Sequence, residues 1–305
     1  MTEWLRSATT SLASSGWLPE TFAYAFMVRA MIACLILAPL LGVLSPLVVT
    51  RGLAFFSSAI GHSALTGLAL AILLGESLDG AGAGVLCFCL LVSVAMTYVR
   101  HRSDLPSDTV IGVFVAFTLG LGICLLVAVT QRFNIHQVEA LLFGSVVTVT
   151  ESDLLFLLGV AVMTVLVIGP MFNGLFLSSV DPELAAARRI NVARNDYFFL
   201  MMLTAVIVAS AKVIGALMVE ALVIVPAAIA RNVAGSLRAY CVWSCVFACV
   251  GTQGGLLLGS FVPVPTGAAI VLVLAGLFGV TFVVSMATAA AARARGRARE
   301  AAGRK

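Results

Sequence analysis

The sequence predicts an all-α membrane protein, a polytopic bundle of about nine transmembrane helices. Of its 305 residues, 61% are hydrophobic and only 10% are charged, whereas a soluble domain carries about 25% charged residues. The apolar residues also fall into runs of about 20, which is the length that a helix needs to cross a bilayer. This composition excludes a soluble globule, because too few polar residues remain to cover its surface.

The first four predicted spans are uninterrupted apolar runs. They contain no charged side chain apart from the titratable His62, and each is long enough to cross the membrane. They cover residues 30–50, 52–75, 80–99 and 109–131.

The remaining spans are predicted from residue 154 onward. Residues 154–180 form the fifth, and two shorter runs, 197–211 and 213–230, are separated by Lys212. We interpret these two runs as helices joined by a tight turn, with one long broken helix as the alternative. The uncharged stretch 239–292 is too long for one crossing, and Pro263 and Pro265 favour a turn within it, which gives two more spans.

The chain is predicted to form one transmembrane domain over residues 22–290, preceded by an interfacial segment, 1–21, and followed by a basic cytoplasmic tail, 291–305. Trp4 and Trp17 are typical of the headgroup region. An orientation with eight spans and the N-terminus inside is the alternative to nine.

The distribution of basic residues predicts the orientation. With nine spans and the N-terminus outside, four Lys or Arg residues lie outside and the remaining 14 of the 18 lie in the cytoplasm, six of them in the tail. The chain is therefore expected to be a multi-pass protein of the inner membrane with a cytoplasmic C-terminus. The four outside are Arg6, Arg29, Arg132 and Lys212.

Several function classes are excluded by what the sequence lacks. It has no Walker lysine motif, no nucleophile elbow and no metalloprotease helix motif, so we do not expect an enzyme. The net charge of +4 reflects topology and not nucleic-acid binding. All seven cysteines lie in apolar runs, so they do not form a disulfide framework.

The first candidate functional residue is His62, near the centre of the second predicted span. A titratable group at that depth is costly and normally faces a cavity or a partner, and imidazole is the commonest metal ligand. Ser58 and Thr66 stand one turn before and after it, so one helix face carries three possible ligands. The alternative is that His62 forms a hydrogen bond to another helix.

The second candidate is Glu220 in the seventh predicted span, six residues before Pro226. An acidic residue at a helix centre costs about 2.5 to 3.5 kcal/mol, so we expect a partner or a watery path. Together with His62 it predicts a transient site for a divalent transition metal. The alternative is a protonated Glu220 or a pair with Lys212.

A third feature is the segment of about residues 178–195 on the basic side. Asp181 is a predicted helix N-cap, Pro182 stands at the first helical position and Glu183 follows. The short amphipathic helix that they start is either a docking element for a cytoplasmic partner or a simple connector.

The motifs of this chain resemble those of permease subunits of bacterial ABC importers for zinc, manganese or iron, the metal ABC-3 type, related to the cobalamin and siderophore importers. The resemblance covers nearly the whole chain in family order. It rests on VVTRGLAFFSSAIGHSALTGLAL, SDTVIGVFVAFTLGLGI, EALLFGSVVTVTESDL, DPELAAARRINV and VIGALMVEALVIVPAAIARN.

The resemblance implies a homodimer with two cytoplasmic ATPase subunits that bind ATP, and an extracytoplasmic protein that delivers the metal. It implies that Asp181, Glu183 and Ala185 belong to a helix that couples to the ATPase. The family's Asp-x-x-x-His motif places its histidine on His62, but its acidic position is Ser58 here. We hypothesise that Glu220 supplies the missing carboxylate.

The expected function is therefore import of a divalent transition metal, zinc or manganese before iron, with Ser58 and Thr66 assisting and Pro226 allowing the helix to bend. No permanently bound cofactor is expected. The alternatives are an ABC permease for a chelate such as cobalamin or haem, a stand-alone proton-coupled carrier, and a membrane scaffold.

Overall fold

A computed structural model of the chain describes residues 24–75, 82–130, 149–262 and 264–302, and every regular element in them is a helix. Nine of these helices are long and apolar enough to cross a membrane, which confirms the predicted bundle. The predicted interfacial segment 1–21 lies outside the described residues. The nine are α2 (Ala25–Thr50), α3 (Phe56–Leu73), α4 (Gly82–Arg102), α5 (Ser107–Thr130), α7 (Glu151–Val180), α9 (Val192–Ile214), α10 (Ala216–Val233), α11 (Leu237–Phe261) and α12 (Thr266–Ala302).

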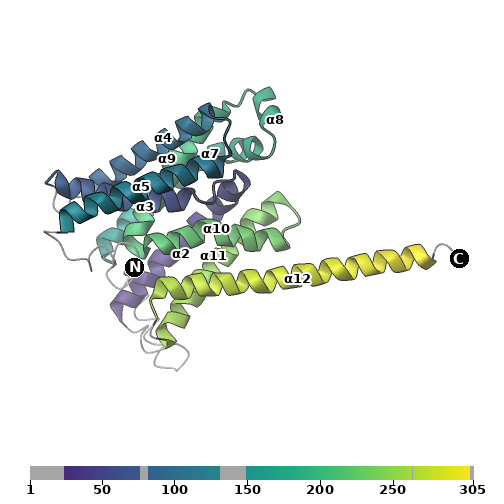
Figure 1. The fold of residues 1–305 in the computed structure, drawn as a ribbon. Helices are drawn as coiled ribbons and strands as arrows, with labels where there is room; N and C mark the ends of the chain where they lie inside the picture. Colours follow the sequence, from purple (N-terminus) through teal and green to yellow (C-terminus); the bar gives the residue numbers. More distant parts are fainter. Residues whose placement is uncertain (1–23, 76–81, 131–148, 263, 303–305) are drawn as a thin grey trace.

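Arginine side chains collect at one end of the bundle, here called the basic end. Arg51 follows α2 and Arg100 lies in the last turn of α4, and both pair with Asp196 near the start of α9. The short helix α8 (Pro182–Ala187) protrudes at the same end (Figure 1). Successive long helices thus run alternately toward and away from this end, as the charge pattern predicts.

The reversal between α9 and α10 takes a single residue. Gly215 has φ +87°, a conformation that side chains with a Cβ atom disfavour, and it separates Ile214 from Ala216. The two helices pack against each other as a hairpin. The predicted tight turn is therefore present, but it lies three residues later than the predicted break at Lys212, because α9 continues to Ile214.

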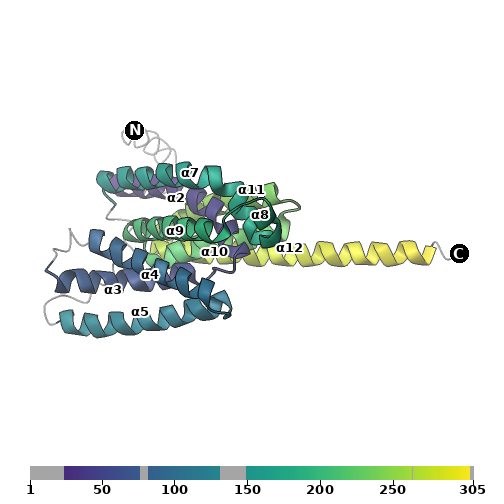
Figure 2. The same ribbon diagram turned by 90° about the horizontal axis from the view of Figure 1, so that it is seen from above.

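The helix α2 is the most buried span and packs against α7, α10 and α11, whereas α5 lies at one edge of the bundle beside α3 and α4 (Figure 2). Glycines allow the closest contact, between α11 and α12. A Cβ atom on Gly255 would lie 2.3 Å from the Cα atom of Ile270, so the two backbones touch there.

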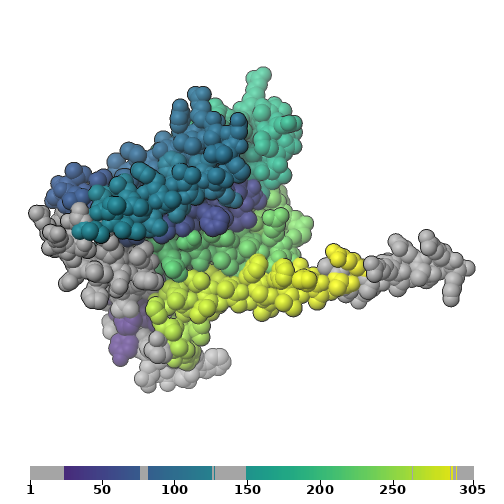
Figure 3. Space-filling view, in the orientation of Figure 1, coloured from purple at the N-terminus to yellow at the C-terminus, as the bar shows by residue number. Residues whose placement is uncertain are grey.

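The last helix, α12, lies along one flank of the bundle (Figure 3) and continues past its basic end (Figure 1). Its apolar part covers Thr266–Thr288, and the helix goes on to Ala302 through most of the basic tail. The hydrophobic span and the charged tail are thus one continuous helix.

Candidate functional site

The imidazole of His62 belongs to the seventh residue of α3, counted from the helix start at the basic end. The side chain is half-buried, and its Nδ1 atom is fully buried without a hydrogen-bond partner among the described residues. A buried polar atom without a partner is rare and costs free energy. The structure therefore does not support the alternative in which Nδ1 of His62 is bonded to another helix of the same chain.

Small residues bring α10 close to His62. A Cβ atom on Gly61 would lie 3.4 Å from the Cβ atom of Ala216, so α3 meets the first turn of α10 at this point. Ala216 stands one helical turn before Glu220, and residues four apart share a helix face. The two predicted ligands are thus on neighbouring helices, close to one contact between those helices.

The carboxylate of Glu220 lies in the second turn of α10 and not at the centre of the span, because α10 begins only at Ala216. The side chain is half-buried and makes no hydrogen bond or ion pair within the described part of the chain. Lys212 instead approaches Asp153, with 3.6 Å between Nζ and Oδ1. The pair between Glu220 and Lys212 that the sequence left open is not formed.

Ser58 and Thr66, which share the helix face of His62, differ in burial and in hydrogen bonding. Ser58 is half-buried, and no hydrogen bond of its side chain occurs among the described residues. Thr66 is fully buried and donates to the carbonyl oxygen of Thr118 on α5 at 2.7 Å. A Cβ atom on Gly122 would come within 2.6 Å of Oγ1 of Thr66, so the hydroxyl sits in a tight helix contact.

Pro226 lies inside α10, where its ring removes one backbone donor and disturbs the hydrogen bonds around it. The backbone N–H of Ala227 donates to Oγ of Ser45 on α2 at 3.2 Å. Ser45 is fully buried, so α2 supports the proline site from the side. This role of Ser45 cannot be predicted from the sequence, because a serine in an apolar run gives no signal of which helix it will face.

The predicted coupling segment forms the short helix α8 at the basic end. Asp181 is its N-cap and accepts the backbone N–H of Leu184 at 2.9 Å, and Pro182 is the first helical residue. Glu183 is exposed, whereas Ala185 is fully buried where α8 packs on α7 and α9. One side of α8 is thus fixed to the bundle and the other is free.

A cluster of charged groups around Asp196, which the sequence does not predict, lies beside this segment. Its carboxylate binds Arg51, contacts Arg100 at 2.7 Å and lies 3.5 Å from Nε2 of His101. The Arg51 guanidinium also donates to the carbonyl oxygen of Leu175, near the end of α7, at 2.7 Å. The Asp196 cluster therefore joins α2, α4, α7 and α9.

Burial of the Arg51 guanidinium lowers its pKa, and the neighbouring Asp196 carboxylate opposes this shift. The side chains of Arg51 and Asp196 are 6% and 8% exposed, so both charges are largely removed from water. The ring of Phe199 covers the Arg51 guanidinium at 5.1 Å. This pairing is therefore a fixed part of the fold and not a solvated surface contact.

The described residues contain no group of three or more His, Cys, Asp and Glu side chains that could hold a metal ion. The seven cysteines are free thiols. Within one copy of the described chain, the candidate site therefore has at most two strong ligands, His62 and Glu220. Such a small set is better suited to passing an ion than to storing it, since structural sites for zinc use four protein ligands.

Comparisons with known proteins identify the family. The model of the ABC 3 transport family matches residues 23–288. The manganese import system permease protein ScaB of Streptococcus gordonii is 31% identical over 260 residues, which is 85% of this chain and 91% of that protein. The high-affinity zinc uptake system membrane protein ZnuB of Haemophilus influenzae is 30% identical over 82% of this chain and 94% of its own.

A solved structure agrees with these sequence matches. The structure of PsaBC from Streptococcus pneumoniae in complex with Fab contains a chain that superimposes with a TM-score of 0.73 and 30% identity. The match covers 85% of this chain and 91% of that one. Since the family model covers most of the residues and the relatives align over nearly their full length, the chain belongs to the ABC 3 transport family.

Proposed function

We propose that this chain is the membrane permease subunit of an ATP-driven importer that moves a divalent transition metal ion into the cytoplasm. The observation that carries the proposal is the buried Nδ1 atom of His62, which has no hydrogen-bond partner among the described residues, in a chain whose relatives are named for manganese and zinc import. Manganese and zinc are the proposed substrates, ahead of iron. An imidazole with a carboxylate suits each of these first-row ions.

His62 and Glu220 are the proposed ligands of the passing ion. Both are half-buried, and neither side chain forms an ion pair within the described residues, so both retain their capacity to bind a cation. The contact between Gly61 and Ala216 supports a shared site, because it holds α3 and α10 together beside these two residues. Glu220 then provides the carboxylate that Ser58 cannot.

Ser58 and Thr66 have different proposed roles. The hydroxyl of Ser58 is free to assist the ion. Thr66 can act as a ligand only if its hydroxyl leaves the carbonyl oxygen of Thr118, so its first role is to hold α3 against α5. Pro226 interrupts α10 six residues after Glu220 and allows this helix to bend during transport.

The energy for transport comes from a partner, since the sequence carries no ATPase motif. We place the basic end in the cytoplasm, following the excess of arginines there. The exposed side of α8, with Glu183, is the proposed contact for an ATPase subunit. The working complex is a dimer of this chain with two ATPase subunits and an extracytoplasmic metal-binding protein, in the inner membrane.

The fixed side of α8 gives a route from the ATPase to the metal site. The end of α7, which leads into α8, is bound by Arg51, and Arg51 is followed by the short turn that begins α3. A displacement of α8 would therefore reach the helix that carries His62 through the side chain of Arg51, which donates a hydrogen bond to the end of α7. This is a proposed path, which the Asp196 cluster supports by its geometry.

The test is uptake by the reconstituted complex. The permease, its ATPase and its binding protein are placed in liposomes, and ATP-dependent uptake of manganese, zinc and iron is measured. We expect uptake of manganese or zinc, at least tenfold lower in Glu220→Gln. The matched control is Asp108→Asn, which neutralises an exposed carboxylate at the start of α5. Uptake by Glu220→Gln equal to wild type at equal expression would refute the role of Glu220. If none of the three metals is taken up, the importer proposal is refuted.

A further inference from the structure

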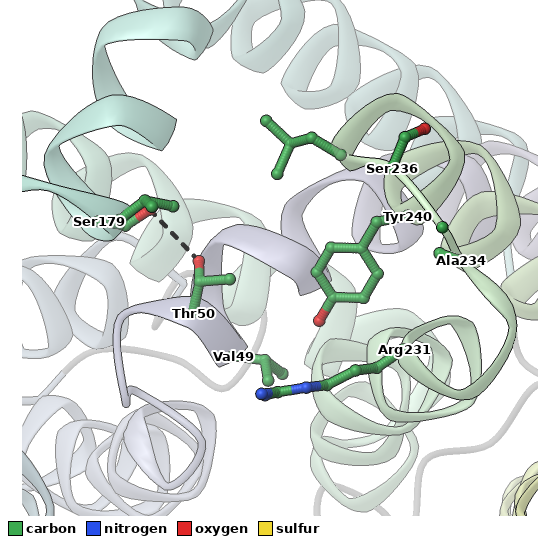
Figure 4. Close-up of a pocket in the computed structure, with 10 residues that line it drawn as sticks. Val49, Thr50, Ser179, Arg231, Ala234, Ser236 and Tyr240 are labelled. Carbon is green, nitrogen blue, oxygen red and sulfur yellow. Dashed lines mark hydrogen bonds between the residues drawn. The ribbon is translucent and has the colours of Figure 1, made fainter. Parts of the chain in front are cut away.

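A second candidate site lies at the basic end, away from His62 and Glu220. It is a cavity of about 490 Å³ between the end of α2, the end of α7 and the turn that joins α10 to α11 (Figure 4). Its polar lining residues are Thr50, Ser179, Arg231, Ser236 and Tyr240, and none of the residues that line it carries a carboxylate. The cavity is therefore rich in hydrogen-bond donors and has no negative charge of its own.

The positive charge comes from Arg231 in the last turn of α10. Its side chain is exposed and makes no ion pair with a carboxylate in the part of the chain that the structure describes. The guanidinium lies among the other lining side chains, below the ring of Tyr240 in Figure 4. This contrasts with Arg51 and Arg100 at the same end, which share the carboxylate of Asp196.

The hydroxyl of Tyr240, independently of Arg231, lacks a hydrogen-bond partner within the described residues. The side chain is only 8% exposed, and its hydroxyl is buried with no hydrogen-bond partner among the described residues. Figure 4 shows this hydroxyl directed into the cavity, toward Arg231. A phenolic hydroxyl and a guanidinium both donate hydrogen bonds, and an oxyanion accepts from both.

The start of α11 adds backbone donors. Ser236 is the N-cap, and its Oγ atom accepts the N–H of Ala239 at 3.3 Å. The N–H groups of Leu237 and Arg238 have no acceptor within the described residues, as expected for the first turn of a helix. The N-terminal end of a helix also carries a partial positive charge that favours anions.

We propose that this cavity binds a phosphate group, held by Arg231, the hydroxyl of Tyr240 and the first turn of α11. The source is either the headgroup of an anionic phospholipid or a soluble phosphate compound. Leu237 and Val180 at the cavity are 51% and 67% exposed, which suits an adjacent acyl chain and favours the lipid. The bound group would connect α10 and α11 to Ser179, two residues before the N-cap of α8.

The proposal is tested by binding to the purified complex of permease and ATPase, without metal and without nucleotide. The result is thus independent of whether the complex imports a metal. Native mass spectrometry compares phosphatidylglycerol with phosphatidylcholine, and isothermal titration measures inorganic phosphate. We expect phosphatidylglycerol to be retained and phosphatidylcholine not.

Two variants and a control assign the binding to this cavity. We expect Arg231→Gln to weaken binding by about tenfold and Tyr240→Phe by about fivefold. The first variant loses a charged donor and the second a neutral one, and hydrogen bonds from charged groups are the stronger. Arg194→Gln removes an exposed arginine on α9, outside the cavity, and should change binding by less than about twofold. Melting temperatures of the three variants show whether each one is folded.

The outcomes are distinct. Loss of phosphatidylglycerol in both cavity variants supports the lipid, and binding of inorganic phosphate alone with the same losses supports a soluble source. The proposal is overturned if neither probe binds to the wild-type complex, or if folded Arg231→Gln and Tyr240→Phe bind as well as the control.

Discussion

The Asp196 cluster and the pair of helices α3 and α10 differ in whether their titratable side chains are paired. At the basic end, one carboxylate is shared by Arg51 and Arg100, and both arginines are almost fully buried. Between α3 and α10, His62 and Glu220 are half-buried and make no ion pair within the described residues. The first group holds the helices together through buried ion pairs. The second group has no such partner, which is the state that the proposed role in binding a passing ion requires.

The largest effect on stability is expected for Asp196→Asn. Removing the carboxylate leaves two buried guanidinium groups without their counter-charge, and breaking a buried pair in this way costs about 3–5 kcal/mol. We expect the melting temperature of the purified protein to fall by several degrees, measured by thermal denaturation in detergent. Asp108→Asn, an exposed change of the same kind, is the control. An unchanged melting temperature would contradict the structural role of Asp196.

For His62→Leu we expect a large loss of metal uptake with little change in stability. This change removes a buried nitrogen that has no partner, so it should alter stability by less than about 1 kcal/mol, while metal uptake falls at least tenfold. The measurements are thermal denaturation and uptake in liposomes on the same preparation. His101→Gln, near Asp196, should retain uptake within about threefold. A large loss of stability in His62→Leu would place His62 with the structural group instead.

A smaller effect is expected for Thr66→Val, which keeps the shape of the side chain and removes its hydrogen bond to Thr118. Hydrogen bonds between membrane helices are worth about 0.6 kcal/mol on average. We expect a slight decrease in melting temperature and uptake within about threefold of wild type. If uptake falls much further at unchanged stability, Thr66 is a ligand of the passing ion.

The smallest effect is expected for Lys212→Gln. The Nζ atom lies 3.6 Å from Asp153, but the lysine side chain is 67% exposed, so water already screens the pair. Exposed ion pairs contribute about 0–1 kcal/mol, and we expect the lower half of this range. Thermal denaturation should give nearly the wild-type curve. A fall in melting temperature as large as that expected for Asp196→Asn would contradict the difference between buried and exposed charges.

The bundle itself could be predicted from the sequence, because span length and hydropathy depend only on local composition. Within the described residues nine helices can span a membrane, as predicted, and the tight turn between the sixth and seventh spans is present. The sequence predicts the break at Lys212, three residues before the reversal at Gly215. A lysine at a helix end can extend into the interface, whereas Gly215 has the positive φ angle that the reversal requires.

The candidate site could be predicted only in part. His62 and Glu220 were found because a titratable residue is unusual in an apolar run. Asp196 was missed, because it stands just before the predicted sixth span and looked like a loop residue; α9 actually starts at Val192 and buries it. Which arginines it binds depends on how α2 and α4 pack, and no local pattern contains that information.

The continuous helix α12 has a practical consequence for biochemical work. The hydrophobic span ends at Thr288, and α12 continues from there to Ala302. At 1.5 Å per residue this last part is about 20 Å long. A purification tag or fluorescent protein fused to the C-terminus would be carried on this rod, beyond the basic end of the bundle (Figure 1). Because α8 lies apart from the end of this helix in Figure 1, we expect such a fusion to leave the exposed side of α8 accessible during assays of subunit assembly.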